Sequence, residues 1–342
     1  MRLAEDAVSH IQALCSIPSP TGFTAGVEKY LMDTLKQMGF EPVHTPKGTV
    51  VCALGGEGNP LLLSAHVDTL GGMVRSVKSS GRLRYTQIGG YNDNAIENEN
   101  CLVHTRNGKA YTGTVQSVKA SRHVYGDTSE MKRSDETLEI VLDEIVHSAE
   151  DVKALGIETG NYISWDARTV VTESGYIKSR HLDDKASSGV LLALARMVKE
   201  GEITLSRCVH LMFTVYEEVG HGASSYLPKD LKDMVAVDMG CVGDDLTCDE
   251  TMVSICAKDS AGPYNYELTN ELIDLAKGKG LRFAVDIYPR YSSDTATALH
   301  AGLEARHALV GPGVFASHGY ERTHKLGVEN TLNLLAAYIA KK

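Results

Sequence analysis

The chain contains a short acidic segment that is better suited to binding a cation than to packing in a core. Residues 179–189 read Ser-Arg-His-Leu-Asp-Asp-Lys-Ala-Ser-Ser-Gly and lead into an apolar helix predicted over 190–198. Asp183 and Asp184 therefore stand at the start of a helix, where the helix dipole favours an anion. A carboxylate there can give one oxygen to each of two metal ions, and we assign that bridging role to Asp183. The alternative is that both aspartates only cap the helix, so the choice depends on partners elsewhere in the chain.

Several strands predicted from the sequence end on residues that can bind metals. Three apolar runs typical of buried strands are each followed by such residues. Residues 61–65 precede His66 and Asp68, residues 206–216 precede Glu217 and Glu218, and residues 234–237 precede Asp238. In α/β sheets, catalytic groups collect at the carboxyl ends of the strands. We therefore expect these five side chains to lie at one edge of a sheet, together with Asp183.

Neighbouring residues within these groups can divide the chemistry between them. In the order His66-Val-Asp68 the two polar side chains point the same way along an extended backbone. Asp68 can then accept the second imidazole N–H and orient the ring for metal binding. Adjacent side chains diverge, so one of Glu217 and Glu218 can bind metal while the other faces a metal-bound water as a general base.

A histidine near the end of the chain completes the set. The segment Ser-His-Gly-Tyr-Glu-Arg-Thr-His contains two candidates, His318 and His324. His318 follows a turn at 311–313 that returns the chain towards the carboxyl edge of the sheet, and Glu321 lies close behind as an acid that can support it. His324 adjoins Lys325 and fits a surface or capping role. We therefore predict His318 as the ligand.

Together these residues predict a dinuclear metal site. The five predicted ligands are His66, Asp183, Glu218, Asp238 and His318. With Asp183 as the bridge they form two roughly tetrahedral sites, about 3.5 to 4 Å apart, with room for a shared water. We expect two divalent ions in each chain and choose zinc, although cobalt and manganese also accept histidine and carboxylate ligands.

The elements that must position these residues form an α/β pattern. Helical periodicity alternates with buried strands and is predicted over 4–14, 25–38, 265–280 and 328–341. We therefore expect a mixed sheet between helices, built from residues 1–71 and 165–342. In residues 72–164, glycine, asparagine and serine punctuate short strands, and Asn107-Gly108 is a hairpin signal. We interpret this segment as an inserted β domain whose edge strands need covering.

The composition argues against several classes of protein. The 342 residues are 43% hydrophobic, enough for one or two large cores, and carry a net charge of −10. No basic block offsets this charge, so we expect no nucleic-acid partner and no binding to anionic membranes. The seven cysteines never form a Cys-x-x-Cys pair and indicate reduced, buried thiols. The sequence begins without an apolar leader and contains no run long enough to span a membrane, so we expect a cytoplasmic protein.

The order of the motifs resembles the M42 family of metallo-aminopeptidases, within the wider group of co-catalytic zinc exopeptidases. The resemblance covers nearly the whole chain and rests on Ala65-His-Val-Asp68, Leu182-Asp-Asp-Lys185, Glu217-Glu-Val-Gly220, Val237-Asp238 and a late histidine. The sequence departs from the family pattern at two places. His221-Gly-Ala replaces the Arg-Gly-Ala of many relatives, and His318-Gly-Tyr replaces the usual His-Ser-Pro.

The resemblance implies an aminopeptidase that acts on peptides with a free N-terminus. It implies one metal held by His66, Asp183 and Asp238, and a second held by Asp183, Glu218 and the late histidine. It also implies that Glu217 is the base that takes a proton from a metal-activated water. The inserted domain would be a β-barrel used for assembly into a homo-oligomer, with a dodecamer as the size that the family suggests.

Three other classes of protein remain as alternatives. A carboxypeptidase or an amino-acid deacylase would use the same metals. A glycoside hydrolase would need only a pair of carboxylates, such as Glu217 and Asp183, and would leave His66 and Asp238 without a role. A non-catalytic scaffold would not need the base. The role of Asp294 is also open between contact with the substrate amine and capping of a helix.

Overall fold

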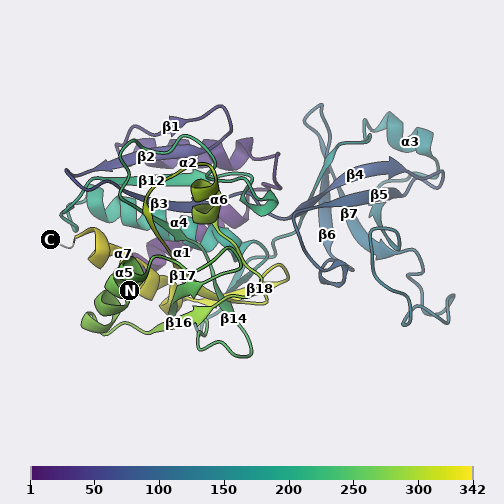
Figure 1. Ribbon diagram of the computed structural model, residues 1–342. Coiled ribbons are helices and arrows are strands. Elements are labelled where there is room, and N and C mark those ends of the chain that lie inside the picture. The colour runs from purple at the N-terminus through teal and green to yellow at the C-terminus, as the bar shows by residue number, and fades with distance from the viewer. Residues whose placement is uncertain (1, 341–342) are drawn as a thin grey trace. The chain divides into compact units, whose positions relative to one another are not determined.

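A mixed twelve-stranded sheet is the centre of the larger of two units in the computed structural model (Figure 1). The structure describes residues 2–340. The larger unit comprises the described residues up to Asp68 and from Arg168 onwards, and the smaller unit comprises Thr69–Ala167. The chain therefore leaves the larger unit after Asp68 and re-enters it at Arg168.

Most strands of the sheet follow one another in hydrogen-bonded order. This order is β1 (Val43–His44), β2 (Val50–Gly55), β12 (Val209–Thr214), β3 (Leu61–His66), β13 (Asp233–Val237), β17 (Arg306–Phe315), β18 (Glu321–His324), β11 (Tyr176–Ser179) and β10 (Val170–Val171). Three more strands lie off this path. β14 (Gly240–Val242) and β15 (Val253–Lys258) both pair with β17, and β16 (Phe283–Ile287) pairs with β15. β12, β3, β13 and β17 run parallel, whereas β2 is antiparallel to β12. The four parallel strands therefore end at the same edge of the sheet.

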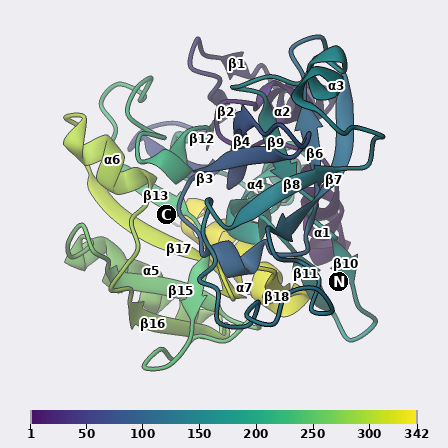
Figure 2. The same ribbon diagram turned by 90° about the vertical axis from the view of Figure 1, so that its right-hand side faces the viewer.

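Helices cover both faces of this sheet, which confirms the predicted α/β fold (Figures 1 and 2). They are α1 (Arg2–Cys15), α2 (Ala25–Gln37), α4 (Leu182–Lys199), α5 (Tyr266–Gly278), α6 (Asp294–His300) and α7 (Lys325–Ile339). α1, α4 and α7 pack against one another. Ala298 of α6 packs against Leu62 and Met234 on one face of the sheet. Leu63 and Val235, next along the same strands, are fully buried and therefore face the helices on the other side.

The observed elements differ from the predicted ones at several places. The apolar pattern predicts a helix from 190, but α4 begins at Leu182 and keeps non-helical backbone angles at Asp183 and Asp184. These first residues are buried although polar, so hydrophobic periodicity does not reveal them. The sequence also does not predict β10, β11, β14, β15 and β18, because short strands depend on pairing with distant segments. The predicted end of the last helix at Lys341 lies outside the described residues.

The smaller unit is a closed β-barrel. Its strands, in hydrogen-bonded order, are β4 (Gly71–Val77), β5 (Leu83–Ile88), β8 (Leu138–Leu142), β7 (Ala110–Ser117), β6 (Asn100–His104) and β9 (Tyr162–Trp165), and it also contains η1 (Asp93–Ala95) and α3 (Ala149–Ala154). The Asn107-Gly108 turn joins the antiparallel strands β6 and β7, as predicted. Tyr85, Ile140 and Trp165 belong to the barrel core. The expectation of free edge strands was wrong, because β8 and β9, which the sequence does not predict, close the barrel.

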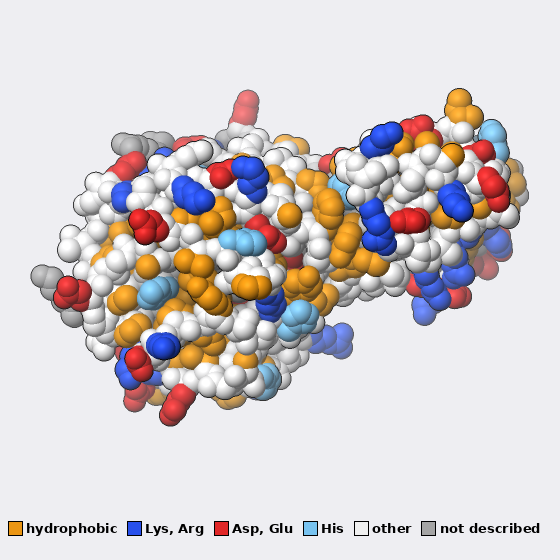
Figure 3. All heavy atoms as spheres, turned by 90° about the horizontal axis from the view of Figure 1, so that it is seen from above, with side chains coloured by type: hydrophobic (Ala, Val, Ile, Leu, Met, Phe, Trp, Pro, Cys, Tyr) orange, Lys and Arg blue, Asp and Glu red, His pale blue; other side chains and the backbone are white. Residues whose placement is uncertain are grey.

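Two further features are the length of the helices and the distribution of charge on one face of the molecule. Within the described residues, every helix is too short or too polar to cross a membrane. On the face drawn in Figure 3, acidic and basic side chains are interspersed rather than gathered into one basic area.

Candidate metal centre

The carboxyl ends of four adjacent parallel strands bring the predicted site residues together. His66 ends β3, Asp238 follows β13, the short turn η2 (Glu217–Val219) follows β12, and His318 lies in the loop after β17. Asp183 comes from the start of α4, which packs against β3. Because the four strands are neighbours and run the same way, residues far apart in the sequence meet at one edge of the sheet.

Five side chains form two groups that share Asp183. Potential ligand atoms of His66, Asp183 and Asp238 lie within 4.8 Å of one another, and so do those of Asp183, Glu218 and His318. The two oxygens of Asp183 face different histidines. Oδ1 lies 3.0 Å from Nε2 of His66, and Oδ2 lies 3.3 Å from Nε2 of His318. One oxygen directed at each group is the arrangement that a bridging carboxylate requires.

The acids of both groups are crowded and shielded from solvent. Burial and the charge of Asp183 raise the pKa of Glu218 to about 8 and that of Asp238 to about 7. Burial alone would lower the pKa of His66, but Asp183 and Glu217 raise it well above its usual value. Like charges in a buried site favour neutral acids, and a cation reverses that preference. The charge balance of the two groups therefore fits bound divalent cations.

An unpaired buried oxygen also fits a cation. Oε1 of Glu218 is shielded from solvent and has no hydrogen-bond partner among the described residues, whereas its Oε2 lies 3.7 Å from Nε2 of His318. A buried polar atom without a partner costs about 1–3 kcal/mol, and more if it is charged. A bound ion would remove that cost. The side chain of His318 is 39% exposed, so this group is accessible from solvent.

Glu321 connects Asp183 to His318. Its Oε2 accepts the backbone N–H of Asp183 at 3.1 Å, and its Oε1 accepts the backbone N–H of His318 at 2.9 Å. Burial and the charge of Asp183 raise the pKa of Glu321 to about 8. His318 has a left-handed backbone with φ 62°, a conformation that costs free energy outside glycine and must be held by its surroundings. Closeness to His318 in the sequence was the only signal of this supporting role.

Asp68 does not make the predicted contact with the imidazole. Nδ1 of His66 lies 3.0 Å from the backbone carbonyl oxygen of Asp68 and 3.7 Å from its carboxylate. The carbonyl therefore takes the place of the side chain, because β3 ends at His66 and the extended backbone that would align the two side chains ends with it. The carboxylate instead accepts the backbone N–H groups of Glu217 and Glu218, at 3.2 and 3.4 Å, and the hydroxyl of Thr21 at 2.7 Å.

Glu217 belongs to neither group of ligand atoms. Its Oε2 lies 3.8 Å from Nε2 of His66, whereas its neighbour Glu218 faces His318. Burial raises the pKa of Glu217 well above its usual value. Tyr216, just before the turn, has a left-handed backbone with φ 69°. The turn thus directs two adjacent carboxylates towards different histidines.

Asp294 and Lys47 hold the loop that follows the two glutamates. Asp294 accepts the backbone N–H of Ala223 at 2.8 Å and the hydroxyl of Thr214 at 2.6 Å. Lys47 donates from Nζ to the carbonyl oxygen of Gly222 at 2.7 Å. A Cβ atom at Gly222 would lie 2.1 Å from Oδ1 of Asp294, so only glycine fits there. The carboxylate of Asp294 is therefore committed to this loop rather than to the start of α6.

Two other histidines lie outside both groups. Nδ1 of His324 accepts the backbone N–H of Leu326 at 3.0 Å at the start of α7, which confirms the predicted capping role. The ring of His221 stacks on Tyr216, with 4.9 Å between the ring centroids. Neither side chain supplies an atom to the two groups around Asp183.

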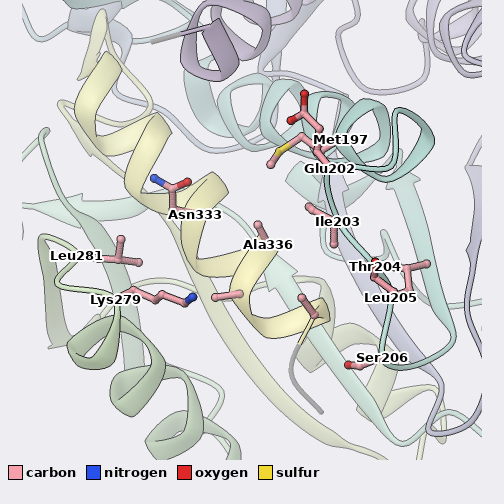
Figure 4. Close-up of a pocket in the computed structure, with 12 residues that line it drawn as sticks. Met197, Glu202, Ile203, Thr204, Leu205, Ser206, Lys279, Leu281, Asn333 and Ala336 are labelled. Carbon is pink, nitrogen blue, oxygen red and sulfur yellow. The ribbon is translucent and has the colours of Figure 1, made fainter.

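A hollow elsewhere on the larger unit lacks chemistry of this kind (Figure 4). Its volume is about 820 Å³, and its lining includes the apolar side chains of Met197, Ile203 and Leu281. Glu202 and Lys279 are its charged lining residues, and no predicted site residue reaches it. This hollow therefore lacks the clustered histidines and acids found at the sheet edge.

Comparison with known proteins shows which proteins the chain resembles. The family profile described as M42 glutamyl aminopeptidase matches residues 48–334. The putative aminopeptidase YhfE of Bacillus subtilis (strain 168) is 44% identical over 331 residues, which cover 96% of this chain and 96% of that protein.

Two solved structures share the fold. The TET aminopeptidase of the marine sediment archaeon Thaumarchaeota archaeon SCGC AB-539-E09 superposes with a TM-score of 0.89 at 18% identity, covering 99% of this chain and 97% of that one. The Pyrococcus horikoshii TET1 peptidase superposes with a TM-score of 0.86 at 20% identity, covering 98% of this chain and 100% of that one. That peptidase can assemble into a tetrahedron or a large octahedral shell.

Proposed function

Because the chain belongs to the M42 glutamyl aminopeptidase family, we propose that it removes N-terminal residues from peptides with a water molecule that two metal ions activate. Membership of this family makes the chain an aminopeptidase, which hydrolyses peptide bonds. The number of ions, their ligands and the base are the proposed part.

The position of Asp183 carries this proposal. Its two oxygens lie 3.0 and 3.3 Å from the Nε2 atoms of His66 and His318. Asp238 joins the first group and Glu218 joins the second. A structural ion pair would need only one histidine and one acid. This arrangement instead provides two sets of donors, each with one histidine nitrogen and carboxylate oxygens, and the two sets share Asp183. We assign zinc to both, since zinc binds histidine and carboxylate ligands in tetrahedral sites.

The chain's own residues would then perform the proton transfers. When bound, the two cations would supply a water of lowered pKa and polarise the peptide carbonyl. Glu217, which lies beside the ligands without joining either group, would take the proton of the attacking water and return it to the leaving amine. Asp68 would hold Glu217 and Glu218 in place by accepting both of their backbone N–H groups.

Peptides with a free N-terminus are the proposed substrates. A carboxypeptidase or a deacylase would need the same donors, but the family profile and the 44% identical relative both favour an aminopeptidase. A glycoside hydrolase would use two carboxylates and leave His66, His318 and Asp238 without a function.

Metal content of variants tests the ligand assignment. We expect about two zinc ions per unaltered chain, none in Asp183→Ala, and about one in His318→Ala, because Asp183 serves both groups and His318 only one. His324→Ala is the matched control and should retain both ions, since that ring caps α7. Elemental analysis of dialysed protein gives the counts. Loss of an ion in His324→Ala with retention of both in His318→Ala would move the ligand to His324.

Assembly is a second expected property. We propose that the chain forms a homo-oligomer. A dodecamer is the proposed size, as the solved structure of PhTET1-12s, with a dodecamer in its asymmetric unit, suggests. In the smaller unit, Ile145 is 92% exposed and Val124 is 70% exposed, and burial in an assembly would cover such apolar side chains. Because the barrel is closed, contacts between side chains, rather than pairing between edge strands, would form that interface. Sedimentation velocity over a range of concentrations measures the mass, and a monomer at micromolar concentration would contradict assembly.

A further inference from the structure

The turn that carries Glu217 and Glu218 needs support from its surroundings. Tyr216 before the two glutamates and Gly220 after them have left-handed backbones, with φ of 69° and 84°. Such a conformation at a tyrosine costs free energy and persists only where neighbouring groups fix it. The glutamates belong to a turn of three residues rather than to a long helix or strand. The direction of each carboxylate therefore depends on contacts from outside the turn.

The loop after this turn folds back against it. The backbone N–H of Gly220 donates to the carbonyl oxygen of Glu217 at 2.8 Å. The backbone N–H of His221 donates to the carbonyl oxygen of Tyr216 at 3.1 Å. Gly222 packs directly on the turn, since a Cβ atom built on it would lie 3.2 Å from Cα of Glu217. A shift of this loop would therefore displace the backbone of Glu217.

Lys47 contacts both ends of this segment. Its ammonium group donates to the carbonyl oxygens of His221 and Gly222, the latter at 2.7 Å, and to the hydroxyl of Ser224 at 3.0 Å. The same nitrogen lies 6.0 Å from the centre of the Tyr216 ring, which is the range of a cation–π contact. A lysine ammonium has three N–H donors, so these three acceptors use all of them. The side chain is therefore committed to the loop rather than available to bind a substrate.

Lys47 reaches the loop from a tight turn between β1 and β2. In this turn the backbone N–H of Gly48 donates to the carbonyl oxygen of Thr45 at 3.0 Å. Gly48 has a φ of 102°, a conformation that favours glycine. A Cβ atom at Gly48 would lie 2.6 Å from Oε1 of Glu28, so the turn packs closely against α2. Lys47 thus ties the glutamate turn to elements that are distant from it in the sequence.

From these contacts we infer that Lys47 is a positioning residue for Glu217. It holds the loop that packs against the Glu217 backbone and so keeps that carboxylate directed at the attacking water. The inference rests on the proposed role of Glu217 as the base. It adds that the rate depends on a lysine that acts only through the loop, at a distance from the reacting atoms.

Lys47→Met in the full, zinc-loaded chain tests the inference, because methionine keeps an apolar stem and removes the three donors. We expect kcat and kcat/KM to fall together by about 10- to 100-fold, the cost of a misplaced catalytic group. Both zinc ions should remain bound. Lys199→Met is the matched control. Lys199 also donates to a backbone carbonyl, that of Gly39 at 2.7 Å, and lies 5.0 Å from the centre of the Phe40 ring, but at the opposite end of α4 from Asp183. Its loss should leave kcat unchanged.

A double-mutant cycle with Glu217→Gln separates positioning from a general structural effect. Lys47→Met should lower the rate little further in the Glu217→Gln background, because the group that Lys47 positions can no longer accept a proton. Ser224→Ala removes one of the three acceptors of the ammonium group. It should cause a smaller loss with the same masking by Glu217→Gln, and it provides the test if Lys47→Met does not fold.

The outcomes distinguish this inference from the proposed function. If the loss in Lys47→Met or Ser224→Ala is absent, or is equal with and without Glu217→Gln, the role of Lys47 is wrong and the base assignment stands. Loss of a zinc ion in Lys47→Met, or the same fall in Lys199→Met, would also overturn the role, because the effect would then not act through Glu217. An unchanged rate in Glu217→Gln alone would overturn the base assignment itself.

Discussion

Removal of divalent metal is expected to abolish hydrolysis of an aminoacyl anilide, and added zinc or cobalt to restore it. The reason lies in the two groups around Asp183, in which three acids and two histidines converge. A bound ion lowers the pKa of water to about 7, so its removal would leave the attacking water a much weaker nucleophile. The measurement is the steady-state rate after exhaustive chelation and after reconstitution with each metal.

Two controls make the chelation result interpretable. The circular dichroism spectrum of the metal-free chain should show that the fold is retained, so that lost activity reflects lost ions. An N-acylated anilide should resist hydrolysis before and after reconstitution, because the proposed reaction requires a free amine. Activity that survives exhaustive chelation would contradict the metal mechanism, and cleavage of the blocked substrate would point to a deacylase or another hydrolase.

Replacement of Glu217 by glutamine should lower kcat by about 10² to 10⁴, the usual contribution of a general base. Glutamine keeps the size of the side chain but cannot accept the proton of the attacking water. Because Glu217 supplies no atom to either group, both zinc ions should remain bound. Single-turnover kinetics and metal analysis on the same sample give both quantities.

Glu218→Gln is the matched comparison for this prediction. Glu218 shares a group with Asp183 and His318, so its amide should cost the chain about one ion as well as activity. The two adjacent variants therefore differ in metal content although both are expected to be slow. If Glu217→Gln loses an ion while Glu218→Gln retains both, the roles of base and ligand are exchanged between these residues.

The fold was predictable where local sequence carries a clear period. The N-terminal helix, α2, β3 and β13 follow directly from apolar spacing, because their buried faces are continuous in the sequence. The barrel in the smaller unit was only partly predictable. β8 and β9, which close it, pair with β5, β7, β4 and β6 across long stretches of chain. No local pattern records such pairings.

The sequence by itself determined which residues are candidates for the site. His66 and Asp238 stand at predicted strand ends, and the carboxyl ends of parallel strands meet at one edge in every sheet of this kind. The divergence of Glu217 and Glu218 was predictable, because adjacent side chains point apart, and it underlies their proposed roles as base and ligand. Residue type, strand ends and alternation are local properties, so they can be read without knowledge of the partners.

Only the tertiary structure decided how these residues meet. Asp183 and His66 are 117 residues apart, and Asp183 and Glu321 are 138 apart, so their contacts depend on how α4 packs against the sheet and on the place of β18 within it. The same packing gives each oxygen of Asp183 its own histidine and commits the Asp68 carboxylate to the two glutamates. Hydrogen bonds form between atoms a few ångströms apart in space, and sequence spacing does not specify that distance once a loop intervenes.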